Sequence, residues 1–131
     1  MTERITLEVP ATLSALSTVH MVLGGLGARL DFSLEDLDDL YLATDRLLVA
    51  ALDTEELESL RVMCVLDDST LQVVAGLFHS TALRGQVIDT PGGCIDLCTL
   101  LQRLVDDVVV EEDGECYSIV IVKHRSTEST T

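Results

Sequence analysis

Aromatic side chains are scarce in this sequence: its 131 residues include two tyrosines, two phenylalanines and no tryptophan. Apolar residues nevertheless make up 47% of the chain, which excludes an extended disordered chain. The hydrophobic core must therefore be built from Leu, Val, Ile and Ala side chains. The length suits one domain with a core of its own.

Positive charge is also scarce, with eight Lys and Arg residues against 23 Asp and Glu residues and a formal net charge of -15 at pH 7. Such a surface repels phosphate backbones and anionic membranes, so we expect no direct binding to nucleic acid or to a membrane. A cationic protein partner would be attracted by this field. The simpler interpretation is that the acidity only keeps a small domain soluble.

No apolar run approaches the roughly 20 residues that span a bilayer, and no secretory leader is recognisable. We therefore expect a cytoplasmic protein with reduced thiols. The four cysteines are interpreted as small apolar side chains. Cys94 and Cys98 are four residues apart, but a metal site would need two further ligands nearby, so none is predicted. The three histidines are widely spaced, and none is interpreted as a metal ligand or general base.

Hydrophobic periodicity predicts three helices and five strands. The predicted strands cover residues 5–9, 60–66, 71–77, 108–110 and 117–122, and the predicted helices cover residues 12–30, 33–52 and 94–105. A loop is expected at residues 79–90 and a disordered tail at residues 125–131. Hairpin-joined strands with helices on one face give one α+β domain over residues 1–124, a two-layer sandwich with a mixed, mainly antiparallel sheet.

Two local patterns concern the first two helices. Gly24, Gly25 and Gly27 interrupt the apolar stripe of the first helix, and each costs up to about 1 kcal/mol of helix preference relative to Ala. They either loosen the helix, end it early or let another backbone pack closely. Ser33 opens a capping box for the second helix, with Asp36 in place of the usual Glu or Gln.

Three stretches resemble a known family: ITLEVPATLSALSTVHMVLGGLG from Ile5, FSLEDLDDLYLATDRLLVAAL from Phe32, and LLQRLVDDVVVEEDGECYSIVIVKH from Leu100. They are similar to the first strand and helix, the ATP-box helix, and the third helix with closing hairpin of the Bergerat-fold (GHKL) ATPase module. The resemblance is closest to the RsbW/SpoIIAB-type anti-sigma factors, which are also serine kinases. It covers Ile5 to His124, and its most specific part is the junction Leu104-Val105-Asp106-Asp107-Val108-Val109-Val110.

The first ATP box of that family places a Glu and, four residues later, an Asn on one helix face. The resemblance assigns these positions to Asp45 and Val49. Asp45 retains a carboxylate, which in the family orients or deprotonates the attacking hydroxyl. Val49 has no lone pair and cannot ligate Mg²⁺, which takes oxygen ligands.

The other two boxes are also altered. The second is Asp-x-Gly-x-Gly after a strand, and the matching stretch from Val74 to His79, which includes Ala75 and Gly76, has no Asp and one Gly. The third is a Gly-x-Gly that approaches the phosphates at a helix N-terminus. Gly92 and Gly93 lie near it but out of register, so we interpret them as a helix start. We therefore predict no catalytic residue, no bound cofactor or metal, and no kinase activity.

The resemblance then implies a regulator that binds a sigma factor or a STAS-type anti-anti-sigma factor, and it also implies a homodimer. The predicted contact surface is the first helix with the acidic start of the second: Glu35, Asp36, Asp38 and Asp39. One alternative is an active Mg-ATP-dependent serine kinase of the RsbW type, with its boxes rebuilt. Another is a scaffold in a different complex, because fold does not determine function.

Overall fold

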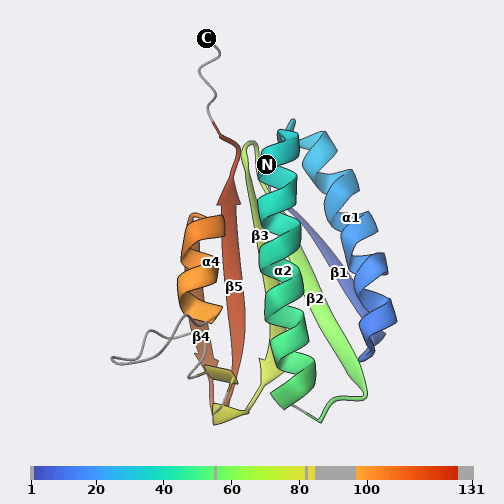
Figure 1. Ribbon diagram of the computed structural model, residues 1–131, viewed down its shortest axis with the longest axis vertical. Coiled ribbons are helices and arrows are strands. Elements are labelled where there is room, and N and C mark those ends of the chain that lie inside the picture. Colours follow the sequence, from blue (N-terminus) through green and yellow to red (C-terminus); the bar gives the residue numbers. More distant parts are fainter. Residues whose placement is uncertain (1, 55, 82, 85–96, 127–131) are drawn as a thin grey trace.

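The computed structural model describes residues 2–54, 56–81, 83–84 and 97–126. Its elements follow the predicted order, and Figure 1 shows their arrangement. The strands are β1 (Glu3–Pro10), β2 (Ser59–Leu66), β3 (Thr70–Phe78), β4 (Asp107–Asp113) and β5 (Cys116–His124). The helices are the short 3-10 turn η1 (Leu13–Ala15), α1 (Leu16–Arg29), α2 (Leu34–Thr54) and α4 (Leu97–Leu104).

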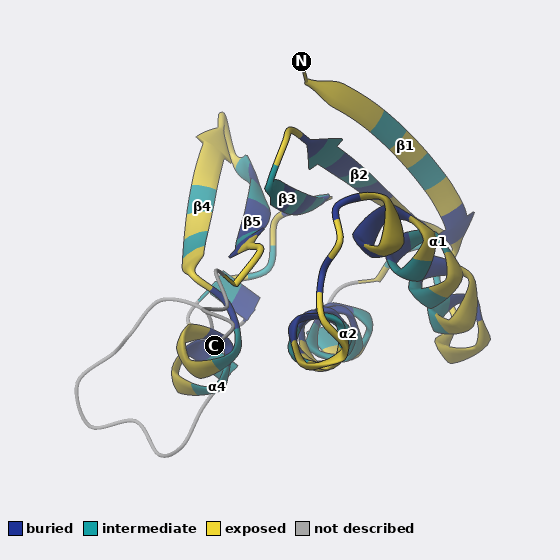
Figure 2. Ribbon diagram, turned by 90° about the horizontal axis from the view of Figure 1, so that it is seen from above, coloured by how far each residue is buried: buried dark blue, intermediate teal, exposed yellow. Residues whose placement is uncertain are grey.

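The five strands form one sheet in the order β1-β2-β3-β5-β4, and every neighbouring pair is antiparallel. Helices α1, α2 and α4 lie on one face of this sheet (Figure 2). The predicted α+β two-layer sandwich is therefore confirmed, but the sheet is antiparallel throughout rather than mixed. The reason is that α1 and α2 run the length of the sheet in opposite directions, so β2 starts at the end where β1 stopped.

The hydrophobic core lies between the sheet and the helices, as strand alternation requires. On β2, for example, Leu60, Val62, Cys64 and Leu66 are buried against the helices, while Arg61 faces the other side. The core contains few rings, and Phe78 with Tyr117 forms an edge-to-face pair with centroids 6.0 Å apart. Burial raises the pKa of the Cys64 thiol to about 11, which agrees with a cysteine that packs rather than reacts.

The glycines of α1 permit close packing of α1 on α2. A Cβ atom on Gly24 would lie 2.5 Å from Tyr41 Oη, and one on Gly27 would overlap Leu37 Cδ2. A Cβ on Gly25 would meet nothing within 4 Å. The helix continues through all three positions to Arg29, so of the alternatives left by the sequence, close approach of a neighbouring helix is correct for Gly24 and Gly27.

Hydrogen bonds hold the start of α2 and the end of the described chain. The predicted capping box is confirmed, since Asp36 N donates to Ser33 Oγ at 3.0 Å and Ser33 N donates to Asp36 Oδ2 at 3.2 Å. The first two residues of the expected tail, Arg125 and Ser126, form hydrogen bonds, and residues 127–131 lie outside the described residues. Arg125 N donates to Ser69 O at 2.7 Å, and Ser126 donates to Asp36. These bonds exist because β5 ends beside the start of α2.

Part of the expected loop at residues 79–90 is helical rather than irregular. Thr81, Leu83 and Arg84 have helical backbones, and Leu83 is fully buried in the core. Residues 82 and 85–90 of that loop, together with Gly92, Gly93 and Cys94, lie outside the described residues. Within the described ranges, no helix is long and apolar enough to cross a membrane.

Candidate functional site

Asp45 projects from α2 toward α1, at the seam between the two helices. His20 Nε2 lies 2.7 Å from Asp45 Oδ1, and the two side chains are 34% and 35% exposed. The His20 ring also stacks on Tyr41, with ring centroids 4.7 Å apart and an interplanar angle of 27°. Tyr41 and Asp45 are four residues apart on one face of α2, which brings both to the same histidine. The carboxylate at the first-box position is thus engaged by α1.

His20 was missed as a site residue because its partner lies 25 residues away on another helix. The glycines of α1 could have indicated that His20 faces α2. Gly24 and Gly27 face Tyr41 and Leu37, so the α1 stripe that meets α2 includes the position one turn before Gly24, which is His20. Within the described residues, no cluster of three or more His, Cys, Asp or Glu side chains is placed to hold a metal ion.

Val49 lies one turn after Asp45 on α2 and is half-buried. Its side chain offers no oxygen to a hard cation. At the second-box positions, Ala75 is fully buried in β3, and its methyl group cannot accept a hydrogen bond. Gly76 faces β5 so closely that a Cβ atom would lie 2.6 Å from Ser118 Oγ. The glycine that the second box retains is therefore required by the packing of two strands.

The acidic start of α2 divides into buried and exposed carboxylates. Asp36 is only 4% exposed, and its Oδ2 accepts hydrogen bonds from Ser33 N, Ser126 N at 3.2 Å and Ser126 Oγ at 3.0 Å. Burial acts to raise the pKa of Asp36, but the hydrogen bonds from Ser126 and Ser33 outweigh it and hold the pKa below the ordinary 3.8. Asp36 is thus not available at the surface where the sequence placed it. Glu35 and Asp38 are exposed there, and Asp39 is half-buried.

Lys123 of β5 lies beneath this acidic start, and no pattern in the sequence indicated this position. Its Nζ is 3.6 Å from Asp39 Oδ2 and 4.0 Å from Asp36 Oδ1, and it donates to Leu104 O at 3.0 Å. Leu104 belongs to the junction that carries the family resemblance. The positively charged Lys123 thus links β5, the end of α4 and the start of α2. We call Glu35, Asp38 and Asp39 the acidic surface from here on.

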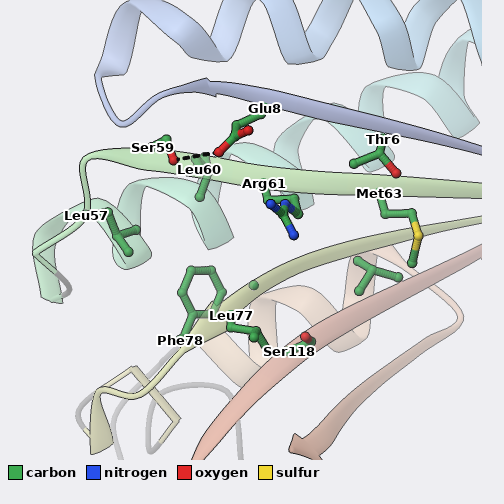
Figure 3. A pocket seen from close by; sticks show the side chains of 12 residues that line it. Thr6, Glu8, Leu57, Ser59, Leu60, Arg61, Met63, Leu77, Phe78 and Ser118 are labelled. Atoms are coloured by element: carbon green, nitrogen blue, oxygen red, sulfur yellow. Dashed lines mark hydrogen bonds between the residues drawn. The ribbon is translucent and has the colours of Figure 1, made fainter.

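A groove of about 510 Å³ lies on the other face of the sheet, away from the helices. Figure 3 shows Arg61 and Met63 of β2 among its lining residues, with Phe78 at one end. Ser59 Oγ donates to Glu8 Oε2 at 3.0 Å along its rim. Of the sequence-predicted site residues, Gly76 lines this groove. The groove and the α1–α2 seam are therefore on opposite sides of the sheet.

No protein-family model matches the sequence, and no curated protein matches it either. Among solved structures, the RsbU and RsbW domains of Rv1364c from Mycobacterium tuberculosis are similar, with a TM-score of 0.63 and 15% sequence identity. The match covers 93% of this chain and 32% of that chain. This chain thus spans about a third of the length of that protein. At this identity the likeness concerns the fold alone: this chain has an α+β fold similar to that of the matched region.

Proposed function

We propose that the protein is an anti-sigma-factor-like regulator that binds a sigma factor or a STAS-type anti-anti-sigma factor without phosphorylating it. The RsbW-like fold over nearly the whole chain supports the class of partner. The contact between α1 and α2 supports the loss of kinase activity, because Asp45 is held by His20 and Val49 occupies the position where the family needs a magnesium ligand. We infer that the first two boxes do not fit Mg-ATP.

The proposed contact surface is the acidic surface together with exposed apolar residues of α1 and α2. Leu34, at the first position of α2, is 80% exposed, and Met21 on α1 is 73% exposed. Exposed apolar side chains supply binding energy when a partner covers them, and the carboxylates attract a partner with basic residues. A sigma factor fits this description because its DNA-binding regions are basic.

An affinity capture tests this proposal: the purified protein is immobilised and incubated with the sigma factors and STAS proteins of the native cell. We expect retention of one of them, and we expect the double substitution Glu35→Lys and Asp38→Lys to weaken it by about tenfold or more. The matched control is Asp53→Lys with Glu56→Lys, which changes the charge equally at the far end of α2. Retention of neither class of protein would refute the proposal.

The second candidate is an active serine kinase of the RsbW type. The observation that favours it is that Asp45 keeps a carboxylate, partly exposed, at the position of the family's catalytic carboxylate. Isothermal titration calorimetry with Mg-ATP separates the two candidates. We expect no heat of binding, whereas a micromolar dissociation constant would establish the kinase and overturn the loss of ATP binding.

A further inference from the structure

Strand β4 forms one edge of the sheet, and its outer backbone groups are unpaired among the described residues. β4 pairs with β5 alone in the part of the chain that the structure describes, and no described helix or strand lies beyond it (Figure 2). The backbone hydrogen bonds that the described residues form outside helices and strands include none from residues 107–113. An open edge of this kind is a template on which a further strand can pair.

The hairpin between β4 and β5 determines which backbone groups point outward. Asp113 pairs with Cys116 across a two-residue turn that begins at Gly114, whose φ is 67°. The pair that closes such a turn exchanges both backbone hydrogen bonds, and along an antiparallel ladder these pairs alternate with pairs that exchange none. The outward N–H and C=O groups therefore belong to every second residue: Val108, Val110 and Glu112. The first of these agrees, because Val108 N donates to Asp107 Oδ1 at 2.9 Å.

The opposite edge of the sheet, β1, has protective features that β4 lacks. Pro10 ends β1 without an N–H group, and charges of both signs lie along the strand at Glu3, Arg4 and Glu8. β4 has no proline and no basic residue, and its pairing with β5 shows no register shift. The centre of β4 is an uninterrupted run of valines at residues 108–110. Edge strands that avoid pairing usually carry a proline, a lysine or a bulge, so β4 is the more receptive edge.

Acidic residues flank the run of valines on both sides. Asp107 precedes the run, and further acids follow it: Glu111, Glu112 and Asp113. Glu112 forms an ion pair with Arg84, whereas the other acids of β4 have no ion-pair partner among the described residues. A second copy of β4 paired antiparallel about Val110 would place Asp107 opposite Asp113, where like charges are destabilising. The edge therefore disfavours its own copy and favours a basic strand.

We propose that β4 binds an extended segment of a partner protein as a sixth strand, in which basic residues flank three apolar residues. The backbone of the segment bonds to the outward groups of β4, and its basic side chains lie opposite the acids, because oppositely charged cross-strand pairs stabilise a sheet. In an antiparallel segment, the residues opposite Glu112 to Asp107 are two basic, three apolar and one basic. The segment does not use the acidic surface, so this proposal can fail while the proposed function stands.

A synthetic peptide with the order Lys-Lys-Val-Val-Val-Lys, acetylated and amidated at its ends, is the probe. It is titrated into nitrogen-15-labelled protein at about 0.15 M salt, where charges are screened over about 8 Å, and the amide signals are followed by NMR. We expect saturable shifts concentrated at Val108, Val110 and Glu112, with a dissociation constant of about 10–500 µM.

Three results of this titration would overturn the proposal. The first is the absence of saturable shifts at the β4 amides up to about 2 mM peptide. The second is a set of shifts spread evenly over the acidic residues of the chain. The third is a β4 signal that moves with protein concentration when no peptide is present, because a second copy then occupies the edge.

Backbone-methylated peptides separate strand pairing from charge attraction, because their charge is unchanged. Methyl groups on the nitrogens of the first and third valines remove the donors that face β4 in the antiparallel arrangement, and binding should weaken by about tenfold or more. Methyl groups on the middle valine and the last lysine remove donors on the far edge of the peptide, and binding should stay within about threefold. Equal binding of the two peptides, or the opposite order, overturns the proposal.

Glu111→Lys and Glu115→Lys are the matched protein variants. Both residues are exposed and both substitutions change the charge equally, but Glu115 lies in the turn beyond β4. We expect Glu111→Lys to weaken the unmodified peptide by about fivefold or more and Glu115→Lys by less than about twofold. Circular dichroism confirms that both variants are folded. Equal weakening would assign binding to the overall negative charge and overturn the proposal.

Discussion

Asp36 and Asp45 are two carboxylates nine residues apart on α2, and their surroundings differ sharply. Asp36 is buried, accepts three hydrogen bonds and lies near Lys123. Asp45 is about a third exposed, and the one side chain that the structure places on it is His20. Asp45, which occupies the predicted first-box position, is therefore held less firmly than Asp36. The residue that the sequence placed on a binding surface instead holds the fold together.

The largest expected effect is that of Asp36→Ala. It removes the acceptor of the Ser33 and Ser126 donors and one of the two carboxylates near Lys123, so the free energy of unfolding should fall by about 2–4 kcal/mol. Urea denaturation followed by circular dichroism measures this loss. The neighbouring exposed Asp38→Ala is the control and should change stability by no more than about 0.5 kcal/mol. Equal effects of the two substitutions would show that the Asp36 network contributes nothing.

The seam that carries Asp45 can be tested by two glycines of α1. Gly24→Ala should be less stable than Gly25→Ala by about 1–3 kcal/mol, because only the first new methyl group meets Tyr41. Gly25→Ala gains helix preference without a collision and should stabilise the protein by up to about 1 kcal/mol. Thermal unfolding of both variants gives the difference. If they match, α1 and α2 are not in close contact at Tyr41.

Acidification tests the hydrogen bonds that Asp36 accepts. The folded pKa of Asp36 is below its ordinary 3.8, so its contribution to stability is complete above about pH 4 and is lost as the pH falls through the folded pKa. We therefore expect Asp36→Asn to flatten the decline of the urea midpoint below about pH 4 relative to wild type. Asp38→Asn should leave that decline as it is. An Asp36→Asn curve parallel to wild type would contradict the lowered pKa.

The smallest effect is expected at Asp45. A double-mutant cycle of Asp45→Asn and His20→Ala should give a coupling free energy below about 1 kcal/mol, because both partners are partly exposed and screened by water. Urea denaturation of the four proteins provides the cycle. A coupling of several kcal/mol would mean that this pair is structural in the same sense as the Asp36 network.

The sequence predicted well the structural features that depend on residues close to one another in the chain. The capping box of Ser33 and Asp36 joins residues three apart, and the alternation of apolar and polar residues from Ile5 to Val9 involves only adjacent positions of one strand. Burial of Asp36 could not be predicted, because it depends on Lys123 and Ser126, about 90 residues later in the chain. An acid in the first turn of a helix usually faces water beside the helix dipole, and that general rule misled here.

The same limit applies to the candidate site. The lack of an oxygen ligand in the Val49 side chain is a property of one residue and could be read directly from the sequence. The engagement of Asp45 by His20 depends on how two helices are aligned, and the glycines predicted their closeness but not their register. Gly92 and Gly93 lie outside the described residues, so their interpretation as a helix start stays a prediction.

Arg125 and Ser126 bring the end of the described chain to a particular place. Arg125 Nη1 donates to Leu30 O at 3.2 Å, and Ser126 bonds to Asp36 at the first turn of α2. Ser126, the last described residue, therefore lies beside the start of α2. The start of β1 is at the same end of the molecule, because Glu3 pairs with Arg29 at the end of α1. A partner that covers the acidic surface therefore approaches the end of the molecule where β1 begins and β5 ends, and an affinity tag for a capture experiment needs a long linker at either terminus.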